Sequence, residues 1–228
     1  GYILTILIGF RFDNGVIIAV DKKTSDLNIS GEDLGTHTLT KKVTTIQRSM
    51  LMATAGLGIG NNLRDLMRVI LDYRQEINVQ EAMEYISSTL QHTYNLFRKV
   101  NPEIQYNDLV ALVGGYDKEK KKSFLYRFSN LNNFIPTLSQ QLIIESPSDE
   151  ITSSIRNHIA KNINTVNDAL ELVPILAQAI RNINSPSVSK ETFVRLKHFD
   201  GEDTFFTETY EYDKNGKDIS KEKPVTPK

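Results

Sequence analysis

The stretch TILIGFRFDNGVIIAVDKKTS, residues 5–25, determines how the fold begins. Two apolar runs, residues 3–12 and 16–20, are joined there by Asp13-Asn14-Gly15. Both runs are rich in β-branched and aromatic residues, which is typical of strands, and an Asn-Gly step is typical of a tight hairpin turn. We therefore predict two paired strands, with Thr5 near the start of the first and Asp21 at the end of the second.

Length and charge narrow the classes of function. The chain has 228 residues, enough to bury a sizeable core, and its 27 basic and 28 acidic residues leave a net charge of −1. This balance gives no electrostatic reason to expect nucleic acid or an anionic membrane as a partner. No apolar run reaches the length of a membrane span and no secretion signal is present, so we expect a cytoplasmic protein.

The spacing of apolar residues along the chain predicts the remaining strands and helices. Alternating or continuous apolar runs predict strands over residues 38–47, 49–55, 109–115, 123–128, 192–199 and 204–212. Helical spacing predicts a helix pair over residues 60–100 and helices over 149–163 and 165–183, the last beginning with a capping box at Thr165 and Asp168. Pro174 predicts a kink or a break in that helix. The polar residues 24–36 predict a surface loop.

The order of these elements indicates the fold class. Strands gather on both sides of paired helices without alternating βαβ units, which favours an α+β fold in which two sheets stack face to face with helices outside. We expect a single domain over residues 1–212. Residues 213–228 are polar, lysine-rich and contain proline, and they predict a flexible C-terminal tail.

The sequence lacks the residues that several common catalytic and binding chemistries require. The chain has no cysteine, which excludes disulfides, thiolate nucleophiles and thiolate metal ligands. The four histidines lie far apart without metal-ligand spacing, and neither GxSxG nor GxxxxGK[ST] occurs. The segment Gly56-Leu-Gly-Ile-Gly60 follows a strand and precedes a helix, but no parallel βαβ frame for a dinucleotide site surrounds it. Its glycines permit a sharp turn or a backbone N–H at an active site. We expect no metal and no cofactor.

Thr5 remains as the candidate nucleophile. A threonine in a strand most often reflects β propensity alone, so the residues around it decide between the structural and the catalytic interpretation. Five segments appear together in order: TILIGFRFDNGVIIAVDKKTS, KKVTTI (41–46), MATAGLGIG (52–60), LVALVGGYDKE (109–119) and AIRNINSPSV (179–188). Together they resemble the proteasome β-subunit-like branch of the N-terminal-nucleophile (Ntn) hydrolases, and bacterial or archaeal relatives in particular. The resemblance extends to about residue 212 and implies a four-layer αββα sandwich of two antiparallel sheets.

The resemblance also implies roles for individual residues. Thr5 corresponds to the nucleophile, Asp21 to its acidic partner, Lys42 to the catalytic lysine, and the backbone N–H of Gly56 to the oxyanion donor. General chemistry is consistent with these roles. A threonine hydroxyl needs a base, which a free α-amine can supply, and a lysine held by a carboxylate stabilises developing negative charge. The set is complete for acyl transfer without histidine or cysteine.

This sequence departs from the family pattern at three places. Leu4 stands where self-cleaving members carry glycine, and four residues precede Thr5. The Gly-Ser-Gly segment of the family is absent; Ser146-Pro147-Ser148 is the nearest match. In the supporting motif after the last helix, Ser187 is kept but Asn184 replaces an aspartate. The layout is nevertheless β-like, because the helix that precedes the first strand in α-type subunits is missing.

These residues lead to one preferred function and two alternatives. The preferred function is a threonine-type peptidase or amidase that acts on peptides or unfolded proteins after the Thr5 α-amine is exposed. The resemblance implies a homo-oligomer, in a ring or related assembly, and an ATP-dependent unfoldase as a candidate partner. The alternatives are an unprocessed, non-catalytic assembly subunit and an acyl-transferring transpeptidase or ligase.

Overall fold

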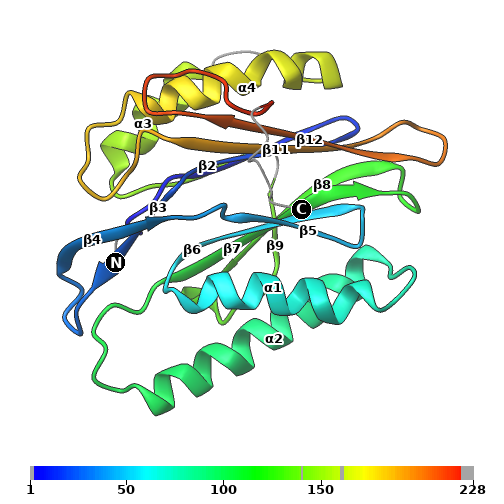
Figure 1. Ribbon diagram of the computed structural model, residues 1–228. Coiled ribbons are helices and arrows are strands. Elements are labelled where there is room, and N and C mark those ends of the chain that lie inside the picture. The colour runs from blue at the N-terminus through cyan, green and yellow to red at the C-terminus, as the bar shows by residue number, and fades with distance from the viewer. Residues whose placement is uncertain (1–2, 140, 160–161, 222–228) are drawn as a thin grey trace, which may run out of the picture.

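Two antiparallel sheets stack face to face between two pairs of helices in the computed structural model (Figure 1). The structure describes residues 3–139, 141–159 and 162–221. The order of layers is helices, sheet, sheet, helices, so the predicted four-layer α+β sandwich is confirmed.

The first sheet carries the strands that begin and end the chain. Its order is β10-β1-β2-β11-β12, and every pair is antiparallel. The strands are β1 (Leu7–Phe12), β2 (Gly15–Asp21), β10 (Leu142–Glu145), β11 (Thr192–Phe199) and β12 (Phe205–Tyr212). The predicted hairpin is confirmed, since β1 and β2 pair from Leu7 with Val20 to Phe12 with Gly15. β2 is buried along its whole length because it lies in the middle of this sheet with covered faces.

The second sheet has the order β5-β6-β7-β8-β9, again antiparallel throughout. Its strands are β5 (Val43–Ile46), β6 (Met50–Gly56), β7 (Leu109–Asp117), β8 (Lys122–Ser129) and β9 (Thr137–Leu138). A short 3₁₀ turn, η1 (Asn130–Asn132), connects the last two. The two edge strands β9 and β10 are only two and four residues long, so no alternation in the sequence predicted them.

The helices cover the outer faces of the two sheets. α1 (Ile59–Asp72) and α2 (Val79–Val100) lie on the second sheet, and α3 (Asp149–His158) and α4 (Val166–Arg181) lie on the first (Figure 1). The predicted capping box at Thr165 and Asp168 begins α4. α4 continues through Pro174 as one helix, so the alternative of a break is wrong; packing of its buried face holds the helix together. None of the helices in the described ranges is long and apolar enough to span a membrane.

Alternating side chains divide the apolar interior into three clusters. On β2, Ile17 and Ala19 face α3 and α4, whereas Val16, Ile18 and Val20 face the other sheet. The cluster between the sheets also contains Leu51 and Leu112 of the second sheet. This inter-sheet cluster fixes the distance between the two sheets.

The segment after Asp21 differs from the prediction of a loop. β3 (Lys23–Leu27) and β4 (Asp33–Leu39) form a separate two-stranded sheet, with Gly31 at φ +85° in its turn. Every residue of β4 is exposed, so no apolar alternation marked it as a strand. The strand predicted over residues 38–47 is accordingly divided between β4 and β5.

The first part of the predicted tail contacts β12. Tyr212 and Asp218 form a β-bridge, and the Ile219 N–H donates to the Glu211 carbonyl at 2.8 Å. Residues 213–221 therefore turn back onto β12. The turn is polar because it lies on the surface, and its composition alone did not reveal this pairing. Residues 222–228 lie outside the described residues.

Leu112 tests the inter-sheet cluster. It is fully buried between the sheets, so Leu112→Ala should lower the free energy of unfolding by about 2–5 kcal/mol, through lost burial and the cavity left behind. Urea unfolding followed by circular dichroism measures the change. The matched control is Leu131→Ala, because that side chain is 78% exposed and should shift stability by less than about 0.5 kcal/mol. Equal losses in the two variants would contradict this account of the core.

Lys197 makes stability depend on pH. It is 3% exposed on β11, and burial lowers its pKa to about 8, with repulsion from Arg195 as a smaller cause. Between about pH 8 and pH 10 the unfolded chain therefore binds more protons at this site than the folded one, and stability should rise with pH. Lys197→Met should make that rise smaller in unfolding experiments across this range, although Lys42, whose pKa is also lowered by burial, still contributes to it. Lys122→Met, at an exposed position, should leave the rise unchanged.

Candidate active site

Four of the predicted site residues lie where the strands of both sheets end. Thr5 comes two residues before β1, Asp21 ends β2, Lys42 immediately precedes β5, and Gly56 ends β6. β1 and β2 belong to the first sheet, and β5 and β6 to the second. Stacking of the two sheets therefore brings these segments to one edge of the sandwich.

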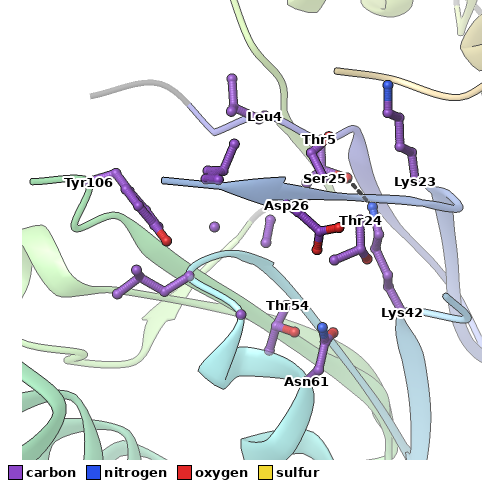
Figure 2. A pocket seen from close by; sticks show the side chains of 15 residues that line it. Leu4, Thr5, Lys23, Thr24, Ser25, Asp26, Lys42, Thr54, Asn61 and Tyr106 are labelled. Atoms are coloured by element: carbon purple, nitrogen blue, oxygen red, sulfur yellow. Dashed lines mark hydrogen bonds between the residues drawn. The ribbon is translucent and has the colours of Figure 1, made fainter. Parts of the chain in front are cut away.

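Three of these side chains are in direct contact. The Thr5 hydroxyl donates to Asp21 Oδ1. Lys42 Nζ donates to Thr5 Oγ1 at 2.6 Å (Figure 2). Lys42 Nζ also lies 3.3 Å from Asp21 Oδ1. Thr5 is 6% exposed, Asp21 0% and Lys42 5%, so the three groups interact largely out of water.

Backbone donors complete the surroundings of the Asp21 carboxylate. The Ile6 N–H donates to Oδ1 at 2.8 Å, and the N–H groups of Lys23 and Ser189 donate to Oδ2 at 3.3 and 3.1 Å. A fully buried carboxylate requires such partners, because removal from water is otherwise costly. These donors come from three segments and fix Asp21 between them.

The pKa of Lys42 is lowered from its ordinary value. Burial is the main cause, because it disfavours the charged ammonium; the adjacent Asp21 carboxylate and its hydrogen bond oppose the shift, and the charge of Arg64 adds to it. The neighbouring Lys41 differs completely: its side chain is 61% exposed and lies 2.8 Å from Glu211. Of the Lys-Lys pair, only the second lysine points into the site, as side-chain alternation near a strand requires.

Arg64 on α1 is a buried residue near the site that the sequence analysis missed. It is 3% exposed, and its guanidinium donates to Thr54 Oγ1 at 2.9 Å, to Thr44 Oγ1 at 3.0 Å and to Asn61 Oδ1. It also donates to the Lys41 carbonyl at 3.4 Å, and burial lowers its pKa to about 10. Arg64 thus connects β5, β6 and the first turn of α1. In the sequence it is one polar position of an amphipathic helix, with no signal that it is buried.

The backbone conformation and the close surroundings of position 56 require glycine. Its φ is +103°, and a Cβ there would lie 2.0 Å from the Asp108 carbonyl oxygen. The following Leu57 N–H donates to that same carbonyl at 2.9 Å. The glycine-containing segment 56–60 therefore forms a sharp turn from β6 into α1. Both surrounding sheets are antiparallel, so a dinucleotide-binding βαβ unit is not present here.

A cavity of about 340 Å³ opens beside Thr5 (Figure 2). Thr5, Lys42 and Gly56 line it, together with residues of β3, the turn after β6, and Tyr106 from the segment before β7. Leu4, which directly precedes Thr5, lines it as well. A ligand in this cavity would reach Thr5, whose hydroxyl contacts Lys42 and Asp21. Within the described ranges, no group of three or more histidine, cysteine, aspartate or glutamate residues could hold a metal ion.

The two predicted supporting residues do not contact the Thr5–Asp21–Lys42 group through any hydrogen bond of the described structure. Asn184 is exposed, and its Oδ1 accepts from Lys190 Nζ at 3.2 Å. Ser187 is buried, and its hydroxyl lies 3.2 Å from that of Ser185. The residue of this segment that reaches the site is Ser189, through its N–H to Asp21. Almost any residue type can donate a backbone N–H, so the sequence could not identify this contact.

Comparison with known proteins agrees with this architecture. The proteasome subunit family matches residues 5–196. Among solved structures, the Anbu (Gly-1) mutant from Hyphomicrobium sp. strain MC1 is similar in fold, with a TM-score of 0.65 and 15% identity over 90% of this chain and 86% of that chain. The comparison with curated proteins finds no match. The family match covers most of the chain and coincides with the four-layer sandwich, and the chain therefore belongs to the proteasome subunit family of Ntn-hydrolase fold.

Proposed function

We propose that this protein is a threonine-type peptidase or amidase with Thr5 as its nucleophile. The single observation that supports this most strongly is the contact of the Thr5 hydroxyl with Lys42 Nζ at 2.6 Å and with the buried Asp21 carboxylate. A core threonine selected only for strand propensity needs neither an ammonium group nor a carboxylate at its hydroxyl. Holding two charges in the interior is costly, so their placement at one hydroxyl favours a chemical role.

The proposed reaction requires a free amine at Thr5. Thr5 is joined to Leu4 in the chain, so its nitrogen is an amide and cannot act as a base. Removal of residues 1–4 would leave an α-amine, whose ordinary pKa near 8 suits proton transfer at neutral pH. Leu4 is 37% exposed and lines the cavity, so the bond before Thr5 lies at the site itself.

Each half-reaction then balances without a cofactor. The Thr5 hydroxyl oxygen attacks the substrate carbonyl carbon, its proton passes to the α-amine, and the negative charge that develops on the carbonyl oxygen faces the turn at Gly56. The carbon–nitrogen bond breaks, the leaving amine takes the proton, and an ester to Thr5 remains. Water then attacks the ester carbonyl carbon and passes a proton to the α-amine. The bond between that carbon and Thr5 Oγ1 breaks, the amine returns the proton to Oγ1, and the carboxylic acid product leaves. Lys42 stabilises the alkoxide-like oxygen, and Asp21 holds Lys42 and Thr5 in place.

A non-catalytic assembly subunit is the second candidate function. Asn184 favours it, because this neutral residue replaces the family's aspartate and its side chain contacts Lys190 rather than the site. The two candidates differ in the reactivity of Thr5. An electrophile selective for N-terminal threonines should modify Thr5 in an enzyme and leave a scaffold subunit unmodified. In either case we expect a ring or related homo-oligomer, as the family resemblance implies.

The identity of the N-terminal residue is the first test of catalysis. Intact-mass spectrometry of protein that hydrolyses peptide amides should find a chain that begins at Thr5. Thr5→Ala should abolish hydrolysis, whereas Thr5→Ser should retain part of it, because serine supplies the same hydroxyl. Active protein that still carries residues 1–4 would exclude the mechanism.

The lysine pair provides a matched second test. Lys42→Met should lower kcat/KM by about 10²- to 10⁴-fold, because the ammonium at the Thr5 hydroxyl is lost. Lys41→Met removes the same charge one residue away, at an exposed side chain, and should change kcat/KM by less than about three-fold. Steady-state hydrolysis of one peptide substrate by both variants measures the difference. Similar kcat/KM values would remove Lys42 from the mechanism.

A further inference from the structure

One of the charged side chains that line the cavity beside Thr5 faces into the cavity. Three charged side chains line it: Lys23, Asp26 and Lys42. Lys42 is occupied by Thr5 and Asp21, and Lys23 Nζ donates to the Pro186 carbonyl and points away from the cavity in Figure 2. Asp26, by contrast, is exposed and directs its carboxylate into the cavity (Figure 2).

The Asp26 carboxylate is held in position from the neighbouring strand. The Thr36 hydroxyl on β4 donates to Asp26 Oδ2 at 2.6 Å, across the β3–β4 hairpin. The hairpin is in turn connected to the segment before β7, since the Gln105 N–H donates to the Ile29 carbonyl at 2.9 Å. The carboxylate is therefore held on the wall of the cavity, and within the described ranges Oδ1 accepts no hydrogen bond, so it can accept one from a ligand. Fixing the acceptor before binding reduces the entropy lost on binding.

The other walls suit the aliphatic part of a long side chain. Leu27 and Leu57 line the cavity, and Tyr106 directs its ring and hydroxyl toward it (Figure 2). An aromatic face next to a carboxylate is a favourable surrounding for an ammonium or guanidinium group. A volume of about 340 Å³ is sufficient for a lysine or arginine side chain.

The floor of the cavity does not provide a competing anion site. Arg64 lies behind it, but its guanidinium is 3% exposed and is faced by Thr54 Oγ1 and Asn61 Oδ1. These oxygens turn toward Arg64 and separate its charge from the cavity. The carboxylate of Asp26 is therefore the charge that a ligand meets directly.

We infer that this cavity receives a cationic side chain of a peptide substrate, from a residue on the amino-terminal side of the bond that is cleaved, and that Asp26 selects it. The inference rests on the proposed function, because it assigns a substrate class to the same site. The aliphatic stem packs on Leu27, Leu57 and Tyr106, and the charged end reaches Asp26. Lysine and arginine share this chemistry, and an acidic side chain would be repelled.

A set of N-acetylated peptide coumarin amides, neutral except at one varied residue, tests the inference. One of the three residues before the coumarin is arginine, leucine or glutamate, and the rest is constant. At one of these positions, arginine should give a kcat/KM about ten-fold above leucine, and glutamate should be poorest. Asp26→Asn should remove the advantage of arginine over leucine, and continued hydrolysis of the leucine peptide shows that the variant is folded. Asp26→Lys should favour glutamate.

Glu32→Gln is the matched control, because Glu32 lies in the turn of the same hairpin, carries the same charge and does not line the cavity. It should retain the wild-type preference. Hydrolysis of the leucine peptide without an advantage of arginine at any position, or an advantage that survives Asp26→Asn, would overturn the inference and leave the proposed function intact. No hydrolysis of any peptide by protein that begins at Thr5 would overturn both.

Discussion

The buried contact between Asp21 and Lys42 at the Thr5 hydroxyl is the constraint on which the site depends. Two opposite charges with almost no exposure are tolerated only where each has further partners, because desolvation costs several kcal/mol per ion. Asp21 obtains its partners from the N–H groups of Ile6, Lys23 and Ser189, and Lys42 from Thr5 and Asp21. A displacement of any one of these segments would remove a partner from a charge held in the interior, so the groups to which the proposed chemistry is assigned also hold the segments together.

The two stacked sheets provide the frame for this contact. Asp21 ends the fully buried strand β2 of one sheet, whereas Lys42 precedes β5 of the other, and the apolar inter-sheet cluster sets their separation. Arg64 adds a second connection, since its hydrogen bonds join β5, β6 and α1 behind the site. Precise geometry at Thr5 is thus a consequence of close packing, which resists small displacements.

The surroundings of Thr5 consist of strand ends in the two stacked sheets and of the segments that form the cavity walls. The reactive groups lie at the ends of regular strands, whereas the cavity walls come from the β3–β4 hairpin, the turn after β6 and the segment that contains Tyr106. Such connecting segments change more readily than packed strands, and they are where binding residues concentrate. Under the proposed function, this division would let one scaffold keep its chemistry while a wall residue such as Asp26 sets the preference for a substrate side chain.

The sequence by itself determined the β1–β2 hairpin and the four helices, because apolar spacing and turn residues are local properties. It identified Thr5, Asp21, Lys42 and Gly56 as candidates only through the resemblance of five ordered segments to the proteasome β-subunit-like family. Only the tertiary structure decided that β3 and β4 pair, that Pro174 lies within an unbroken helix, and that Ser189 and Arg64 support the site while Asn184 does not contact it. The physical reasons differ. A fully exposed hairpin carries no apolar alternation that would mark its strands, whereas a backbone donor and a buried guanidinium are identified only by the groups that fold against them.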